Sequence, residues 1–319
     1  MKKEILIIAL TLFLTSFISA AVINADNTNV GCSDITGTPY CTIQAAVNAA
    51  TSGDVVNVSA GTYNENIVID KGLNLIGSPG NSPGPGPNAP VLDGLGTVGR
   101  AITINGGVSN VKIQGFEITD YRNSGLSGGI GSGVLAWNSV GISNIEILDN
   151  YFHDLGWSAV LFGNEGQSLH GNILVENNLI KDIAFYSIEL TNTKNSIVRE
   201  NTVTGGIGVV YTTVLTENTD DGILIQSQVH TGLGHTVNNV TVQKNILNGS
   251  FERAGIELLA WDSTDSLTSE LDGIEVRDNS VENALRGIYV FSVGANADID
   301  NVDIANNILD GNSDGIQIR

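Results

Sequence analysis

The segment Asn239-Val-Thr-Val-Gln-Lys-Asn-Ile-Leu-Asn-Gly-Ser-Phe-Glu-Arg-Ala-Gly-Ile-Glu-Leu-Leu-Ala260 decides the fold of this chain. It contains a short alternating run, an Asn, two apolar residues, a polar turn and then Gly-Ile-x-Leu. Related Gly-Ile-x-Leu elements begin at residues 133, 159, 187, 222, 255, 287 and 315, at intervals of 26 to 35 residues. Recurrence at this spacing indicates an internal structural repeat.

Each repeat contains three strand-length pieces in which apolar and polar residues alternate, so each piece can bury only one face. The intervals leave no helical pattern between the strands. We therefore predict an all-β fold: a single-stranded, right-handed parallel β-helix over residues 54–319, with three strands per coil and about eight to nine coils. Neighbouring coils would stack about 4.8 Å apart around an apolar interior.

An Asn recurs once per repeat, immediately after the alternating run. We expect it at a bend between two strands, because Asn tolerates the left-handed backbone conformation. Stacked in register, the side-chain amides would hydrogen-bond from coil to coil as a ladder. The residues concerned are Asn150, Asn178, Asn201, Asn245, Asn279 and Asn307.

The repeat resembles the right-handed parallel β-helix of the pectin-lyase-like superfamily, in the group with carbohydrate-binding and sugar-hydrolase repeats. The resemblance covers about residues 54–319. It implies that a polysaccharide binds along the outer face of the Gly-Ile-x-Leu strands and their flanking loops. The opening Cys41-Thr-Ile-Gln-Ala-Ala-Val47 is also similar to members in which a short helix caps the first coil.

The segment 22–53 carries this capping element. Apolar residues at Ile43, Ala46, Val47 and Ala50 follow the i, i+3, i+4, i+7 spacing of a short amphipathic helix. A helix here would close the open N-terminal end of the coils, as solenoids require.

Residues 1–21 are predicted to form a secretory signal peptide. Lys2 and Lys3 precede an apolar run, and small residues at 19–21 offer a cleavage site. The alternative is an uncleaved membrane anchor, for which the apolar run is short. A signal peptide predicts a secreted or cell-surface protein, with no membrane insertion of the mature chain.

The two cysteines of the chain, Cys32 and Cys41, lie nine residues apart around a Gly-Thr-Pro turn. In an oxidising compartment we expect them to form a disulfide. No His or further Cys lies close to them in the sequence, so we predict no metal site there.

The formal net charge is −20, and the sequence pI is about 4.3. Nucleic acids and anionic membranes bind clustered Lys and Arg, so neither is an expected partner. A polyuronate would be repelled unless Ca²⁺ or local arginines bridged it, whereas a neutral glycan would meet no such barrier. We expect an extracellular polysaccharide as the partner, with Ca²⁺ as a cofactor only if that polysaccharide is a polyuronate.

The sequence ends at Arg319, directly after a Gly-Ile-Gln-Ile element. An uncapped coil would leave backbone groups unpaired. We therefore expect that the β-helix lacks its C-terminal cap and that further domains of a longer parent chain follow.

Candidate site residues come from the outward positions of the Gly-Ile-x-Leu strands, because side chains alternate between the two faces. The third position holds Glu189, then Leu224 in the next repeat, then Glu257 and Tyr289, and the fifth position of an earlier repeat holds Trp137. The proposed groove combines catalytic candidates with aromatic residues that would stack on sugar rings. The catalytic candidates are Glu189, Asp221, Arg253 and Glu257, and the substrate-binding candidates are Trp137, Trp157, Tyr186 and Tyr289.

Two reactions fit these residues. In a glycoside hydrolase, Glu189 or Glu257 would be the acid and another carboxylate the base, and their separation across two coils favours inversion. In a lyase, carboxylates would hold Ca²⁺ against a uronate while Arg253 removes a proton.

Two function classes therefore stay open. The first is a secreted protein that binds and processes polysaccharide as a lyase, hydrolase or epimerase. The second is a non-catalytic, adhesin-like structural module on the cell surface, which the regular repeat and the outward leucines favour.

Overall fold

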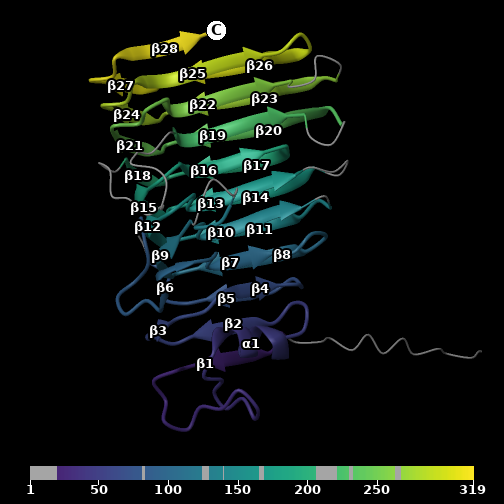
Figure 1. Ribbon diagram of the computed structural model, residues 1–319, viewed down its shortest axis with the longest axis vertical. Helices are drawn as coiled ribbons and strands as arrows, with labels where there is room; N and C mark the ends of the chain where they lie inside the picture. Colours follow the sequence, from purple (N-terminus) through teal and green to yellow (C-terminus); the bar gives the residue numbers. More distant parts are fainter. Residues whose placement is uncertain are drawn as a thin grey trace, which may run out of the picture.

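The computed structural model describes residues 20–80, 83–123, 129–138, 140–164, 169–205, 221–229, 233–262 and 267–319. Residues 1–19, which make up most of the predicted signal peptide, lie outside this part of the chain. In the described residues the strands form three sheets, and every strand pairing is parallel. The chain visits the sheets in turn, so the coils stack along the long axis (Figure 1).

The strands of each sheet recur once per coil. The first sheet contains β1 (Val22–Ala25), β2 (Val55–Val58), β5 (Asn74–Ile76), β8 (Ser109–Gln114), β11 (Ser143–Leu148), β14 (His170–Glu176), β17 (Thr193–Arg199), β20 (His235–Gln243), β23 (Ser269–Arg277) and β26 (Ala297–Ala305). The second contains β4 (Ile67–Ile69), β7 (Ile102–Ile104), β10 (Val134–Asn138), β13 (Val160–Asn164), β16 (Tyr186–Thr191), β19 (Asp221–Gln228), β22 (Ala254–Trp261), β25 (Arg286–Val293) and β28 (Asp314–Ile318). The third contains β3 (Thr62–Tyr63), β6 (Val91–Val98), β9 (Glu117–Arg122), β12 (Tyr151–Leu155), β15 (Leu179–Ile183), β18 (Thr202–Gly205), β21 (Ile246–Gly249), β24 (Ser280–Glu282) and β27 (Ile308–Asp310).

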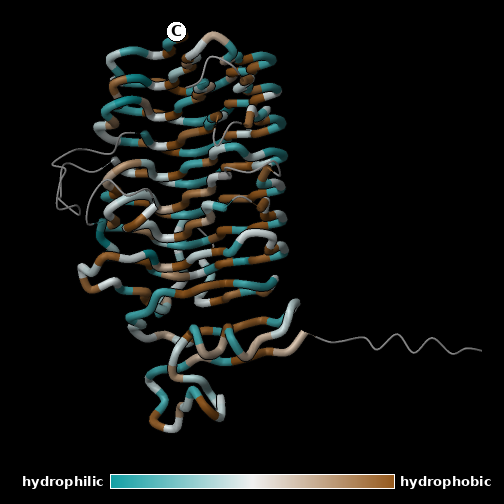
Figure 2. The backbone as a smooth tube through the Cα atoms, turned by 45° about the vertical axis from the view of Figure 1, so that its right-hand side comes forward, coloured by the Kyte–Doolittle hydropathy of each residue, from teal (hydrophilic) through white to brown (hydrophobic). Residues whose placement is uncertain are grey.

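This arrangement confirms the predicted parallel β-helix. The register aligns the repeats as the sequence indicated, since Ile256 pairs with Ile223 on one side and Ile288 on the other. All three side chains are fully buried in one continuous apolar core, and so is Leu258. Apolar and polar segments alternate along the coils in Figure 2, as one-faced strands require.

The N-terminal end carries the predicted helix, α1 (Ile43–Ala49), which lies beside β1 and β2 (Figure 1). The Thr42 side chain caps it by accepting a hydrogen bond from the Ala45 amide, at 3.2 Å. Its apolar face joins the core through Ile43, Ala46 and Val47. The same segment also adds β1 to the first sheet, a strand that the repeat pattern did not indicate.

The predicted disulfide between Cys32 and Cys41 is present, with a Cα–Cα distance of 5.0 Å. Among the described residues, no helix has the length and apolar character needed to cross a bilayer.

The predicted asparagine ladder is present from Asn150 to Asn307. Each amide nitrogen donates to the amide oxygen of the next coil, at 2.9 to 3.1 Å. The backbone prediction was wrong by one residue, because the left-handed conformation lies at the preceding position, as at Glu200 and Lys244. The ladder side chain must enter the buried interior, so the residue before it, which is exposed at Glu200 and Lys244, makes the bend and bears the strain of positive φ.

Candidate functional site

A groove of about 750 Å³ lies on the outer face of the second sheet. It crosses six neighbouring strands, from β10 to β25, which corresponds to about 24 Å along the stack. All three tryptophans of the chain line it. Its described lining is Gly129, Trp137, Trp157, Leu161, Tyr186, Glu189, Leu224, Gln226, Gln228, Arg253, Leu259, Trp261, Phe291 and Val293.

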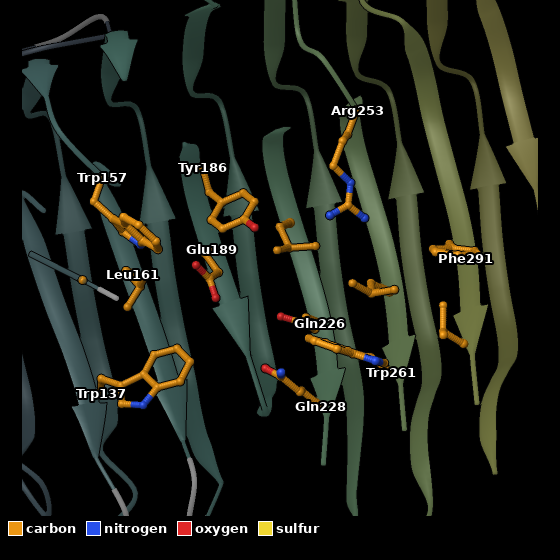
Figure 3. A pocket seen from close by; sticks show the side chains of 14 residues that line it. Trp137, Trp157, Leu161, Tyr186, Glu189, Gln226, Gln228, Arg253, Trp261 and Phe291 are labelled. Carbon is orange, nitrogen blue, oxygen red and sulfur yellow. The ribbon is translucent and has the colours of Figure 1, made fainter. Parts of the chain in front are cut away.

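Two rows of side chains border the groove in Figure 3. Trp157, Tyr186 and Arg253 lie along one edge, where the chain enters the strands of the second sheet. Trp137, Gln228 and Trp261 lie along the opposite edge, where these strands end. Glu189 and Gln226 lie between the two rows, so polar groups face a channel with aromatic walls.

The floor of the groove includes three residues of the third-position column, Leu161, Glu189 and Leu224. They point away from the core cluster, as predicted, yet each is 5% exposed or less. The apolar members therefore form a recessed floor and not a solvated strand face. A recessed floor of leucines beneath aromatic walls suits the apolar faces of sugar rings.

Gly163 explains the position of Trp137. The two residues are register partners on neighbouring strands, and the indole of Trp137 occupies the space above Gly163. A Cβ atom added at Gly163 would come within 2.2 Å of two ring carbons of Trp137. The glycine therefore makes room for the indole on the groove wall.

We expect Gly163→Ala to displace the Trp137 ring and to shift the tryptophan fluorescence of the folded protein. If the ring stacks on a ligand, the loss of about 1 kcal/mol weakens binding roughly fivefold. Gly171→Ala is the matched control, because a Cβ there meets its nearest neighbour at an ordinary 3.5 Å. Unchanged fluorescence in Gly163→Ala would contradict this account of the wall.

Behind this wall, the buried imidazole of His170 joins two strands of the second sheet. Its Nε2 lies 2.8 Å from the Gly163 carbonyl and 3.3 Å from that of Ala136, and its Nδ1 accepts from the Ile142 amide at 3.0 Å. Burial lowers the pKa of His170 to about 4, so the ring stays neutral near neutral pH. The sequence offered no signal for this residue.

Glu189 is the one carboxylate among the described lining residues. Its Oε1 accepts a hydrogen bond of 2.9 Å from the Thr191 hydroxyl, which also lies 3.1 Å from Gln226 Oε1. Burial raises the pKa of Glu189 to about 7, and the Thr191 hydrogen bond lowers it by a smaller amount. This carboxyl is therefore partly protonated near neutral pH and able to donate a proton.

Glu257 and Asp221 do not line the groove. Both side chains are fully buried, and Glu257 forms an ion pair with Arg253. Burial raises the pKa of Glu257, whereas a hydrogen bond with Asp221 and the charges of Arg253 and Arg286 act in the opposite direction. The catalytic roles assigned to these residues stay predictions, but contact of Glu257 with a sugar would require movement of the groove wall.

Tyr289 also lies outside the lining. Its ring is buried beneath the Arg286 guanidinium, which lies 4.6 Å from the ring centroid, and it stacks on Phe291 at 5.1 Å. Phe291, one alternation further along β25, takes the groove position instead. Five of the predicted residues therefore line the groove, namely Trp137, Trp157, Tyr186, Glu189 and Arg253. The other three, Asp221, Glu257 and Tyr289, are buried beside it, and Glu257 contacts Arg253 there.

Sequence reasoning missed Trp261 and Gln228 as lining residues. Both follow the same alternation as the third and fifth positions, but two residues further along β22 and β19. Because these strands have eight residues, extending the alternation past the Gly-Ile-x-Leu element would have found them.

In the described part of the chain, no three His, Cys, Asp or Glu side chains are grouped as metal ligands would be. A Ca²⁺ requirement for a uronate substrate stays a prediction.

Neither a protein-family model nor a curated protein matches the chain. Solved structures do match it at low identity. A pectin methylesterase from Aspergillus niger is 12% identical, with a TM-score of 0.50, over 90% of this chain and 84% of that one. An alginate lyase from a Paenibacillus species is 14% identical, with a TM-score of 0.49, over 92% and 97%.

The catalytic domain of a GH87 alpha-1,3-glucanase matches at 14% identity and a TM-score of 0.46, and the chain covers 57% of its length. At these identities the likeness concerns the fold alone. The chain is a parallel β-helix of the kind found in pectin-lyase-like proteins, so the resemblance inferred from the repeat is confirmed for the fold.

Proposed function

We propose that this chain is a secreted or cell-surface protein that binds extracellular polysaccharide in the groove on the second sheet. The observation that carries the proposal is the gathering of all three tryptophans, with Tyr186 and Phe291, on one recessed face. Aromatic rings stack on the apolar faces of sugars, and Gln226 and Gln228 supply amides for their hydroxyls. The disulfide between Cys32 and Cys41 supports an oxidising, extracellular location.

A second candidate function is cleavage of the bound polysaccharide, with Glu189 as the general acid. It is favoured by the pKa of about 7, which matches a proton donor to neutral pH. Glycoside hydrolases of the common type use two carboxylates, and Glu189 is the one that the described lining provides. Binding of a polysaccharide is therefore better supported than its cleavage.

The test is a binding panel of gluco-, manno-, xylo-, galacturonate and alginate oligosaccharides, read by calorimetry. We expect at least one glycan to bind, and Trp137→Ala and Trp261→Ala to weaken it by about 2 kcal/mol each, roughly thirtyfold. Tyr151→Ala is the control, because this aromatic residue lies on the third sheet, stacked on His153 at 4.3 Å.

The same mixtures are analysed for products. A turnover that Glu189→Gln abolishes would make the groove catalytic. If no glycan in the panel binds, or if the tryptophan variants bind as tightly as the parent, the proposal fails.

A further inference from the structure

The groove holds few charges for a strongly acidic protein. Its described lining contains five aromatic and four aliphatic side chains, two glutamines, and only Glu189 and Arg253 as titratable or charged groups apart from Tyr186. The formal charges of these two residues cancel, so the rest of the chain carries the net charge of −20. A polyanionic ligand would therefore need compensation from within the groove.

Arg253 is the cation that could provide this compensation, and its guanidinium extends over the groove from the entry to β22 (Figure 3). The positive charge of Arg253 already has a negative partner in direct contact. The guanidinium pairs with Glu257 four residues later, and the Glu257 side chain is fully buried while that of Arg253 is 35% exposed. A buried partner is poorly screened by solvent, so it cancels much of the field that Arg253 would direct at a ligand.

The second nearby cation, Arg286, is directed elsewhere. Its Nη1 donates to the Arg253 carbonyl at 3.0 Å, its Nε donates to Gln317 at 2.5 Å, and its guanidinium covers the Tyr289 ring. Arg286 does not line the groove. It stabilises the backbone that presents Arg253 and leaves the ligand-facing charge unchanged.

Given the glycan-binding function proposed above, we infer that the groove selects neutral glycans and discriminates against polyuronates. Glu257 sets this selectivity by holding Arg253 in a neutral pair. A neutral sugar can still accept hydrogen bonds from the guanidinium, stack on the tryptophans and bond to the glutamines. A row of carboxylates would face Glu189 on the floor and a cation that is already paired.

The experiment compares glycans that differ only in charge. A galacturonate hexasaccharide is used as the free acid and as its full methyl ester, and a glucose hexasaccharide is used alongside its C6-oxidised, carboxylated form. Affinities are measured by calorimetry at low salt. We expect the neutral member of each binding pair to bind at least about tenfold more tightly.

Glu257→Gln tests the cause, because it keeps the side-chain shape and removes the carboxylate charge that pairs with Arg253. The ratio of affinities should move toward the carboxylated member by at least about fivefold, and added salt should remove the gain. Glu275→Gln is the control, since it removes the same charge from the first sheet, where Glu275 pairs with Arg277 at 3.3 Å. If Glu257→Gln does not fold, the Arg253→Gln/Glu257→Gln double variant, which keeps the pair neutral, should retain the preference of the parent.

The outcomes separate the two proposals. If a carboxylated member binds the parent protein as tightly as its neutral counterpart, the selectivity is overturned while glycan binding stands. If no glycan binds at all, the proposed function itself fails. If Glu257→Gln folds and leaves the ratio unchanged, the role of Glu257 is wrong.

Discussion

Asn201→Ala is expected to lower the free energy of unfolding by about 3–5 kcal/mol, the largest effect that we predict for a single side chain. Asn201 lies within the ladder and is buried. Its amide nitrogen donates to the Val175 and Arg199 carbonyls and to Asn245, each at 3.0 Å, and its oxygen accepts from the Asn178 backbone and side chain. Alanine would leave several buried polar groups without partners, and each costs about 1–3 kcal/mol.

The measurement is urea unfolding of the parent and the variant, followed by circular dichroism. Asn57→Ala is the matched control, because Asn57 lies in a strand of the first sheet and makes one exposed side-chain bond of 3.2 Å to Asn24. We expect the control to change the unfolding free energy by less than about 1 kcal/mol. Equal losses in the two variants would show that the ladder adds nothing beyond an ordinary surface asparagine.

Glu189→Gln is expected to change the pH dependence of stability more than the substitution of any other residue that lines the groove. The pKa of Glu189 is about 7 in the folded protein, against an ordinary value of 4.5. Between these values the folded state keeps a proton that the unfolded state has lost, so the stability contributed by the protonated carboxyl is full below pH 4.5 and is lost as pH rises through 7. At about 1.4 kcal/mol per pH unit, the loss reaches about 3 kcal/mol.

Glutamine does not ionise, so the variant should unfold with a flatter pH profile than the parent. The two proteins should differ least near pH 4.5, and above pH 7 the variant should be more stable by up to about 3 kcal/mol. Glu275→Gln is again the control, since its ion pair is exposed and such pairs contribute at most about 1 kcal/mol. Parallel profiles for the parent and Glu189→Gln would mean that Glu189 ionises normally.

Much of the fold could be read from the sequence because period-two alternation and the repeat interval both report local geometry. The pairing of Ile223, Ile256 and Ile288 follows directly from aligning the repeats. The asparagine ladder could be predicted for the same reason, but the backbone conformation beside it could not. Which of two adjacent residues takes positive φ depends on which one must point into the core. Glu200 and Lys244 show that Asn preference alone cannot decide this.

The candidate site was predicted less completely. Trp137 and Glu189 could be placed on the outer face by parity, that is, by their odd or even position along the strand, because successive side chains point to opposite faces. Parity cannot tell whether an outward side chain is covered by its neighbours. Glu257 has the same parity as Glu189, yet it is buried in a pair with Arg253, and Tyr289 is covered by Arg286.

By itself, the sequence determined that the chain forms a parallel β-helix with a capping helix, a disulfide and an asparagine ladder, since each depends on residues at fixed spacing. Only the tertiary structure decided that the three tryptophans meet in one groove, that Gly163 makes room for one of them, and that one of two equivalent glutamates faces the groove. The physical reason is that solvent exposure and charge depend on side chains from neighbouring coils, which lie about 4.8 Å away in space but some 30 residues away in sequence.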